Sequence, residues 1–128
     1  MADVGWINEM VATWNSHDGE MTASFFAPGG CYEDVTFGFL HEGREPIAHM
    51  WSVSTRGFSA DAHFDVESAV CDENGYAFQW HWTGTHNETG RAFDVQGASI
   101  GRLRDGLILH HFDYWNPAHL TDQIGPIG

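Results

Sequence analysis

The sequence is poor in basic residues, with 5 Lys and Arg against 18 Asp and Glu and a formal net charge of −13. A nucleic-acid-binding protein displaces counterions with a basic surface, which this composition cannot supply. An anionic membrane surface would repel the chain for the same reason. We therefore expect no nucleic-acid partner and no membrane partner, which leaves small neutral or cationic molecules and other proteins.

Cysteine is also scarce, because Cys31 and Cys71 are the only two in the chain. Isolated cysteines of this kind are typical of reduced core residues rather than of a disulfide framework. The residues from Met1 to Trp6 lack the basic start and apolar run of a secretory signal, and no hydrophobic stretch reaches transmembrane length. The expected location is therefore cytoplasmic.

Motifs for metals and cofactors are missing as well. The chain has 9 His, yet it contains neither a His-Glu-x-x-His motif nor paired cysteines. His110 and His111 are adjacent in a predicted strand, so they point to opposite faces and cannot easily share one ion. There is also no glycine-rich phosphate loop and no nucleophile elbow. We expect no metal and no cofactor.

Aromatic residues are abundant, with 6 Trp and 9 Phe in 128 residues of which 42% are hydrophobic. Such a chain can bury a hydrophobic core without disulfide bonds or metal ions, and its aromatic side chains also suit apolar pockets and interfaces. No repeat, low-complexity segment or linker divides the sequence. We therefore expect one domain that covers residues 1–128.

Helical patterns dominate the first half of the chain. Apolar residues recur at helical spacing from Val4 to Trp14. Asp18 can cap a second short helix, which carries Met21, Phe25 and Phe26 and which Pro28-Gly29-Gly30 should break. A strand over 31–37 and a turn over 38–43 follow, and then a third helix runs from Pro46 to Gly57.

The second half changes to a strand pattern. Four β-rich segments are separated by turn sequences that include Asn-Gly and Asp-Gly, which are strong hairpin signals. They are 62–71, 76–86, 91–103 and 107–116, and a short helix begins at Pro117. Helices before a long antiparallel meander indicate an α+β fold. We expect a cone in which N-terminal helices pack on a strongly curved, mostly antiparallel sheet that encloses a pocket.

The order of several short motifs resembles the nuclear transport factor 2-like superfamily, and within it the SnoaL-like polyketide cyclase family. The resemblance covers nearly the whole chain. Its pieces are Trp14-Asn15-Ser16-His17-Asp18, Phe25-Phe26-Ala27-Pro28, Tyr32-Glu33-Asp34-Val35, Gly43-Arg44-Glu45-Pro46-Ile47, Thr83-Gly84-Thr85-His86, Ile100-Gly101-Arg102, Arg104-Asp105-Gly106-Leu107-Ile108, Tyr114-Trp115-Asn116 and Leu120-Thr121-Asp122-Gln123-Ile124-Gly125.

The resemblance implies a pocket inside the curved sheet, a homodimer, no cofactor, and a carboxylate on the last long strand that acts as acid or base. That carboxylate corresponds to Asp113. The chain departs from the family at three positions: Asn116 replaces a second Asp, Ser99 stands near a cyclase His, and Gln79 stands near an epoxide hydrolase Arg. These departures weigh against epoxide hydrolysis and against a straightforward cyclase.

Strand alternation sorts the candidate residues onto faces. Asp113 shares one face of the last strand with His111 and Trp115, and we assign this face to the pocket. On the 76–86 strand we assign His81 and its neighbours Gln79 and Thr83 to the pocket. The alternate face with Trp80 would then pack outward, in a dimer.

Each candidate has a functional and a structural interpretation. Asp113, among aromatic residues, can take a proton from carbon or give one to a developing enolate or alkoxide; the alternative is a structural carboxylate. His81 can orient Asp113 or polarise a carbonyl, or it is a half-exposed sheet histidine. Gln79 and Ser99 can donate hydrogen bonds to a substrate oxygen, or they are ordinary polar sheet residues.

An apolar wall for a small apolar or aromatic ligand can be formed by Trp14, Phe26, Tyr32, Met50 and Trp51, although core packing is the alternative for each of them. Two hypotheses remain open. The first is an enzyme of proton-transfer type, a cyclase, isomerase or dehydratase acting on an apolar carbonyl compound, with Asp113 and His81 as catalytic residues. The second is a non-catalytic ligand-binding or dimerisation module with the same pocket.

Overall fold

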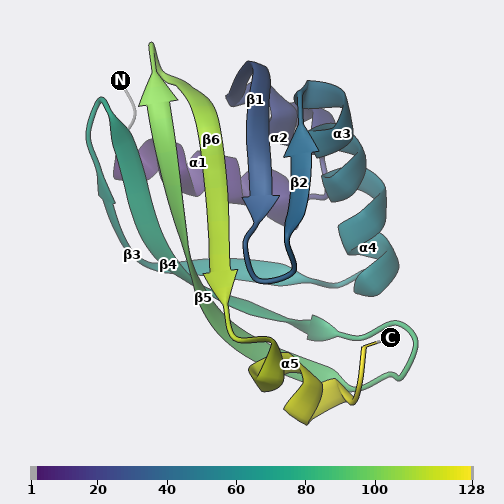
Figure 1. Cartoon of the computed structure of the whole chain (residues 1–128). Coiled ribbons are helices and arrows are strands. Elements are labelled where there is room, and N and C mark those ends of the chain that lie inside the picture. The colour runs from purple at the N-terminus through teal and green to yellow at the C-terminus, as the bar shows by residue number, and fades with distance from the viewer. Residues whose placement is uncertain (1–2, 128) are drawn as a thin grey trace.

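The computed structural model describes residues 3–127 and confirms the α+β class (Figure 1). One six-stranded sheet has the order β2-β1-β6-β5-β4-β3, and helices pack against it. The pair β1–β6 is parallel, and all other neighbouring pairs of the sheet are antiparallel. None of the helices within the described range is long and apolar enough to cross a membrane.

Two short helices open the fold. Helix α1 (Val4–Asn15) begins at Asp3, whose carboxylate accepts a hydrogen bond from the backbone N–H of Trp6, and it buries Ile7, Met10, Val11 and Trp14. Helix α2 (Gly19–Ser24) is capped by Asp18 in the same way, as predicted. An N-cap acceptor satisfies a backbone donor that the first helical turn leaves without a partner.

The segment after α2 differs from the prediction. Helix α2 ends at Ser24, so Phe26 is the first residue of strand β1 (Phe26–Asp34) rather than a helical residue. The predicted breaker, Pro28-Gly29-Gly30, lies inside β1, where the register against β6 shifts between Phe26 and Cys31. Proline lacks a backbone N–H donor and glycine lacks a side chain, and both are tolerated at such an irregularity. Pro28-Gly29-Gly30 therefore interrupts the hydrogen bonds between the strands without ending β1.

The predicted turn over 38–43 is also wrong in part, because it contains the edge strand β2 (Phe39–Glu42), which pairs with the end of β1. A continuous helical segment follows, made of α3 (Arg44–His49), the π-helical turn η1 (Met50–Ser54) and α4 (Thr55–Phe58). Single π-helical turns widen a helix locally and often occur at functional sites. Here η1 carries Met50 and Trp51 toward the interior.

Four long strands form the rest of the sheet, close to the predicted ranges. They are β3 (His63–Cys71), β4 (Gly75–Thr85), β5 (Ala92–Arg104) and β6 (Leu107–Trp115). Helix α5 (Pro117–Ile124) starts at the cap residue Asn116 and buries Leu120 and Ile124 beside Phe93 and Val95 of β5. Figure 1 shows the sheet bending around the N-terminal helices, with α5 beyond the end of β6.

Candidate functional site

Asp113 lies on the inner face of the sheet, near the end of β6. Strand pairing places Ser99 of β5 directly opposite Asp113, and the parallel pairing of β1 places Asp34 opposite it on the other side. Neighbouring strands lie about 4.8 Å apart. Side chains at paired positions of the same face are therefore close together, although they come from distant parts of the sequence.

Three side chains contact the Asp113 carboxyl. The Ser99 hydroxyl donates to Oδ1 at 2.6 Å, and Nε2 of His111 lies 2.7 Å from the same oxygen. The Tyr32 hydroxyl donates to Oδ2 in a short contact. The Asp113 side chain is only 13% exposed, whereas that of His111 is fully buried. Such contacts hold the carboxyl in one orientation.

A second buried group fixes the tautomer of His111. The Tyr76 hydroxyl lies 2.5 Å from Nδ1 of His111. Burial and then the charge of Asp113 raise the pKa of Tyr76 well above its ordinary value, so this phenol stays protonated and donates to Nδ1. The remaining proton of a neutral imidazole is then on Nε2, where it points to Asp113. Tyr76, His111 and Asp113 thus form one directed hydrogen-bonded chain.

A cavity of about 520 Å³ opens beside Asp113. Most of its wall is aromatic. The cavity is lined by Tyr32, Asp34, Phe37, Phe39, His41, Met50, Trp51, Ser54, Thr55, Phe58, Phe64, Trp80, Trp82, Asp113, Trp115, Leu120 and Ile127. This size and this mixture of apolar wall and few polar groups are typical of small-molecule sites.

The second carboxyl in the cavity, that of Asp34, was missed by the sequence reasoning as a site residue. Burial and then the negative charge of Asp113 raise the pKa of Asp34 above its ordinary value. Its contacts are long, because Nε1 of Trp115 lies 3.3 and 3.4 Å from its two oxygens. The signal was available: Asp34 follows Tyr32 by two residues, so strand alternation places both on one face.

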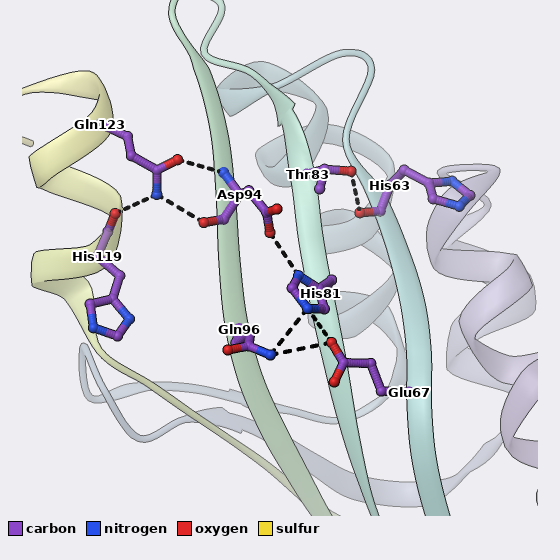
Figure 2. Close-up of polar contacts among 8 residues, drawn as sticks. All are labelled: His63, Glu67, His81, Thr83, Asp94, Gln96, His119 and Gln123. Carbon is purple, nitrogen blue, oxygen red and sulfur yellow. Dashed lines mark hydrogen bonds and ion pairs between the residues drawn. The ribbon is translucent and has the colours of Figure 1, made fainter.

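The assignment of His81 to the pocket is wrong. Figure 2 shows His81 on the outer face, where its ring lies between Glu67 of β3 and Asp94 of β5. Nδ1 of His81 is 2.7 Å from Oδ1 of Asp94, and Nε2 contacts Glu67 and the amide of Gln96. His81 therefore cannot contact Asp113, and any catalytic role for it lacks a structural basis.

Gln79 and Thr83 share the outer face with His81. The Gln79 side chain is exposed and accepts a hydrogen bond from Ser68, while the Thr83 hydroxyl reaches the carbonyl of His63. The alternate face of β4, expected to point outward in a dimer, instead lines the cavity with Trp80 and Trp82. Alternation within one strand gives two faces, but only the register against β5 decides which of them faces the interior.

That register places Trp80 opposite Gly97. A side chain at position 97 would collide with the Trp80 ring, since a Cβ built on Gly97 lies 2.3 Å from Cη2 of Trp80. The indole thus occupies the space that glycine leaves, and its Nε1 donates to Ser99 at 2.9 Å. The inner face is therefore the aromatic one.

The other predicted residues divide into three groups. Tyr32, Met50, Trp51 and Trp115 line the cavity, as their assignment to its wall requires. Trp14 and Phe26 do not; they are buried in the core, where Trp14 stacks on Trp51 with ring centroids 4.8 Å apart. Ser99 and His111 are buried behind Asp113, so they act on the cavity through that carboxyl.

Within residues 3–127, no group of three or more His, Cys, Asp and Glu side chains is placed to hold a metal ion. The ionisable side chains that line the cavity are Tyr32, Asp34, His41 and Asp113, and the imidazole of His111 lies buried behind Asp113.

Known structures share this architecture. A hypothetical protein from Catenulispora acidiphila with a ketosteroid isomerase-like fold, solved in complex with trimethylamine, superposes with a TM-score of 0.86 at 22% identity, covering 94% of this chain and 92% of that one. IdmH from Streptomyces antibioticus, described as a candidate polyketide cyclase, gives a TM-score of 0.79 at 24% identity, with 94% and 96% covered. At these identities the likeness establishes the fold alone.

A third structure, TsrD from Streptomyces laurentii, gives a TM-score of 0.82 at 17% identity and covers 99% of this chain and all of that one. No curated protein matches the sequence significantly. A family model described as the SnoaL-like domain matches residues 7–111, which run from α1 through the first part of β6. The chain therefore belongs to the SnoaL-like family.

Proposed function

We propose that this protein is a cofactor-independent enzyme that moves a proton on a small carbonyl compound, with Asp113 as its general acid and base. The observation that carries the proposal is the orientation of Asp113, whose carboxyl faces an aromatic cavity while Ser99, His111 and Tyr32 hold it from behind and from the side. A fixed carboxyl beside an apolar cavity is suited to proton transfer.

The chemical step follows from these contacts. The Asp113 carboxylate takes a proton from the carbon next to a carbonyl, and the electron pair of that C–H bond becomes part of an enolate. Burial and the charge of Asp113 raise the pKa of Tyr32, so its hydroxyl stays protonated; once Asp113 holds the substrate proton, this hydroxyl can turn from Oδ2 of Asp113 and donate to the enolate oxygen. Return of the proton from Asp113 to another carbon isomerises the substrate. Alternatively, the enolate carbon attacks a second carbonyl and closes a ring, and the alkoxide formed there takes the proton back from Asp113.

The pair of carboxyls supports proton uptake. Asp34 and Asp113 lie at paired positions of neighbouring strands, and two negative charges at this distance repel each other. A proton taken from the substrate removes one of these charges and relieves the repulsion between the two carboxylates.

A ligand-binding module without turnover is the second candidate. It is favoured by the same three contacts, because they occupy three of the roughly four lone-pair sites of the Asp113 carboxylate and so leave few of them facing a substrate. In that case Asp113 would only orient the ligand. The expected homodimer remains a prediction, as does the exact reaction within this class.

Proton exchange separates the two candidates. The rate at which the acidic C–H groups of 2-tetralone exchange in D₂O can be followed by NMR, with and without protein. We expect exchange above the buffer rate, and a loss of about 10²- to 10⁴-fold in Asp113→Asn. The matched control is Asp94→Asn, which removes one carboxylate from the outer face and should leave exchange unchanged. Equal rates in wild type and Asp113→Asn would contradict the proposal, and exchange no faster than in buffer would favour the binding module.

A further inference from the structure

Asp34 faces the cavity, but in the proton transfer proposed above it neither takes nor gives the proton and acts only through its charge beside Asp113. It lies at the end of β1, opposite Asp113 in the register of the sheet, and both carboxyls line the same cavity. Its carboxyl receives long contacts from the Trp115 indole, one of 3.4 Å from the backbone N–H of Phe37, and a weaker one from the backbone N–H of Thr36. A partly buried carboxylate with such contacts is poorly compensated.

The cavity provides no positive charge to balance these carboxyls. No Lys or Arg is present among its lining residues in the described part of the chain. The basic lining residue is His41, whose pKa is lowered by burial and by the nearby His49, so it is neutral at neutral pH. The chain as a whole carries a formal net charge of −13, so its surface does not compensate the two carboxylates either. An anionic ligand would therefore be repelled, and a neutral one would leave Asp34 uncompensated.

The rest of the wall suits an organic cation. Trp51, Trp80, Trp82 and Trp115 all line the cavity, and tryptophan is the aromatic side chain that attracts cations best. Quaternary and protonated amines are weakly hydrated compared with metal ions, so an aromatic wall and one carboxylate can replace their water shell. The cavity volume, about 520 Å³, leaves room for an apolar body attached to the amine.

We infer that the substrate is an amine, protonated or quaternary, attached to an apolar carbonyl-containing body, and that its ammonium group binds between Asp34 and the tryptophan wall. The inference rests on the proposed function for the role of Asp113 and gives Asp34 a separate role as the anchor of the cation. Different residues would then recognise the two parts of the ligand: Asp34 would bind the ammonium group, and the aromatic wall would bind the apolar part.

A matched pair of probes tests the charge alone. The (3-hydroxyphenyl)trimethylammonium ion and 3-tert-butylphenol have nearly the same shape and differ by one positive charge. Binding to the full chain can be measured by quenching of tryptophan fluorescence and by calorimetry. We expect the cation to bind at least about tenfold more tightly, which corresponds to about 1.4 kcal/mol. Tighter or equal binding of the neutral probe, or no binding of either probe at millimolar concentration, would overturn the inference.

Two variants assign the preference to Asp34. In Asp34→Asn the ratio of the two dissociation constants should fall to within about threefold of one, whereas Asp94→Asn, which removes the same charge from the outer face, should keep the wild-type ratio. An unchanged ratio in Asp34→Asn would show that the net charge of the chain, not Asp34, selects the cation. Because binding is measured without turnover, a protein that fails the exchange assay but prefers the cation refutes the proposed reaction and leaves this inference intact.

Discussion

The two faces of the sheet carry the same pairing of histidine and carboxylate in different surroundings. On the inner face His111 and Asp113 are 0% and 13% exposed, and on the outer face His81, Glu67 and Asp94 are 33%, 36% and 59% exposed. Solvent screens the outer pairs, so they contribute little to stability. The inner pair is shielded from water, and each of its polar atoms depends on a partner in the protein. Burial, rather than residue type, separates the site from the surface.

The largest difference should appear when each histidine is truncated. His111→Ala removes a fully buried ring, leaves the Tyr76 hydroxyl without its acceptor and takes one donor from Asp113. We expect a loss of about 2–4 kcal/mol in the free energy of unfolding. His81→Ala should cost about 0.5 kcal/mol or less. Urea unfolding followed by fluorescence measures the free energy of unfolding of both variants. Equal losses would mean that burial of the His111–Asp113 pair does not contribute to stability.

A glycine on the inner face should be nearly as sensitive. In Gly97→Ala the added methyl group meets the Trp80 ring at 2.3 Å, so the indole or the backbone must move. We expect a loss of about 1–3 kcal/mol and a change in the tryptophan emission spectrum. The next residue, Ala98, points to the outer face, and Ala98→Ser should change stability by about 0.5 kcal/mol or less. A Gly97→Ala protein as stable as the Ala98→Ser protein would show that the contact with Trp80 relaxes freely.

A hydroxyl on each face gives a smaller contrast. Ser99→Ala removes the donor to Asp113 and leaves Nε1 of Trp80 without its acceptor, which should cost about 1–2 kcal/mol. Ser68→Ala removes an exposed hydrogen bond to Gln79 and should cost about 0.5 kcal/mol or less. Denaturation midpoints of the two variants decide the comparison. If Ser68→Ala costs more, the inner hydroxyl is not part of an interdependent network.

Most helices and strands could be predicted from the sequence because the patterns that specify them involve residues close together in the chain. Cap residues such as Asp18, the turns between the long strands and the helical spacing from Val4 to Trp14 each act within a few residues. The elements predicted from them agree with the structure to within a residue or two in the second half of the chain. The errors occurred at β1 and β2. Strand β1 pairs with β6, which is distant in sequence and overrides the local preference of Pro28-Gly29-Gly30, and β2 then pairs with β1 as an edge strand.

The site could be predicted only along one strand at a time. Alternation placed Asp113 on a face with His111 and Trp115, and the structure puts Asp113 and Trp115 on the cavity and His111 directly behind Asp113. Alternation could not show which face of β4 lies on the same side of the sheet as the Asp113 face of β6. That depends on the register between strands, which no single strand determines. His81 was therefore assigned to the wrong side, although the unequal size of Trp80 and Gly97 would have suggested that these two residues face each other.

The smallest predicted effect concerns pH and compares Asp34 in the cavity with Asp61 at the surface. Burial and the charge of Asp113 raise the pKa of Asp34 in the folded state above its unfolded value, near 3.8. At pH values between these two pKa values, the folded state binds more protons than the unfolded state. Stability due to Asp34 therefore falls as pH rises through this window. The pKa of Asp61 is lowered by hydrogen bonds from the Thr85 backbone, the Thr85 hydroxyl and Ser59, so its contribution is present above 3.8 and is lost as pH falls below it.

Substitution should accordingly act in opposite directions at the two positions. At pH 7 we expect Asp34→Asn to increase the free energy of unfolding, by about 1 kcal/mol or less because the carboxyl keeps some solvent contact. Asp61→Asn should decrease it, because its charged acceptor for Thr85 and Ser59 is lost. Urea unfolding at a series of pH values from about 2 to 8 measures both slopes, that of Asp34 above pH 3.8 and that of Asp61 below it. A protein destabilised by Asp34→Asn at neutral pH would show that Asp34 is already well compensated, and the cavity would then have no unbalanced charge with which to select a cation.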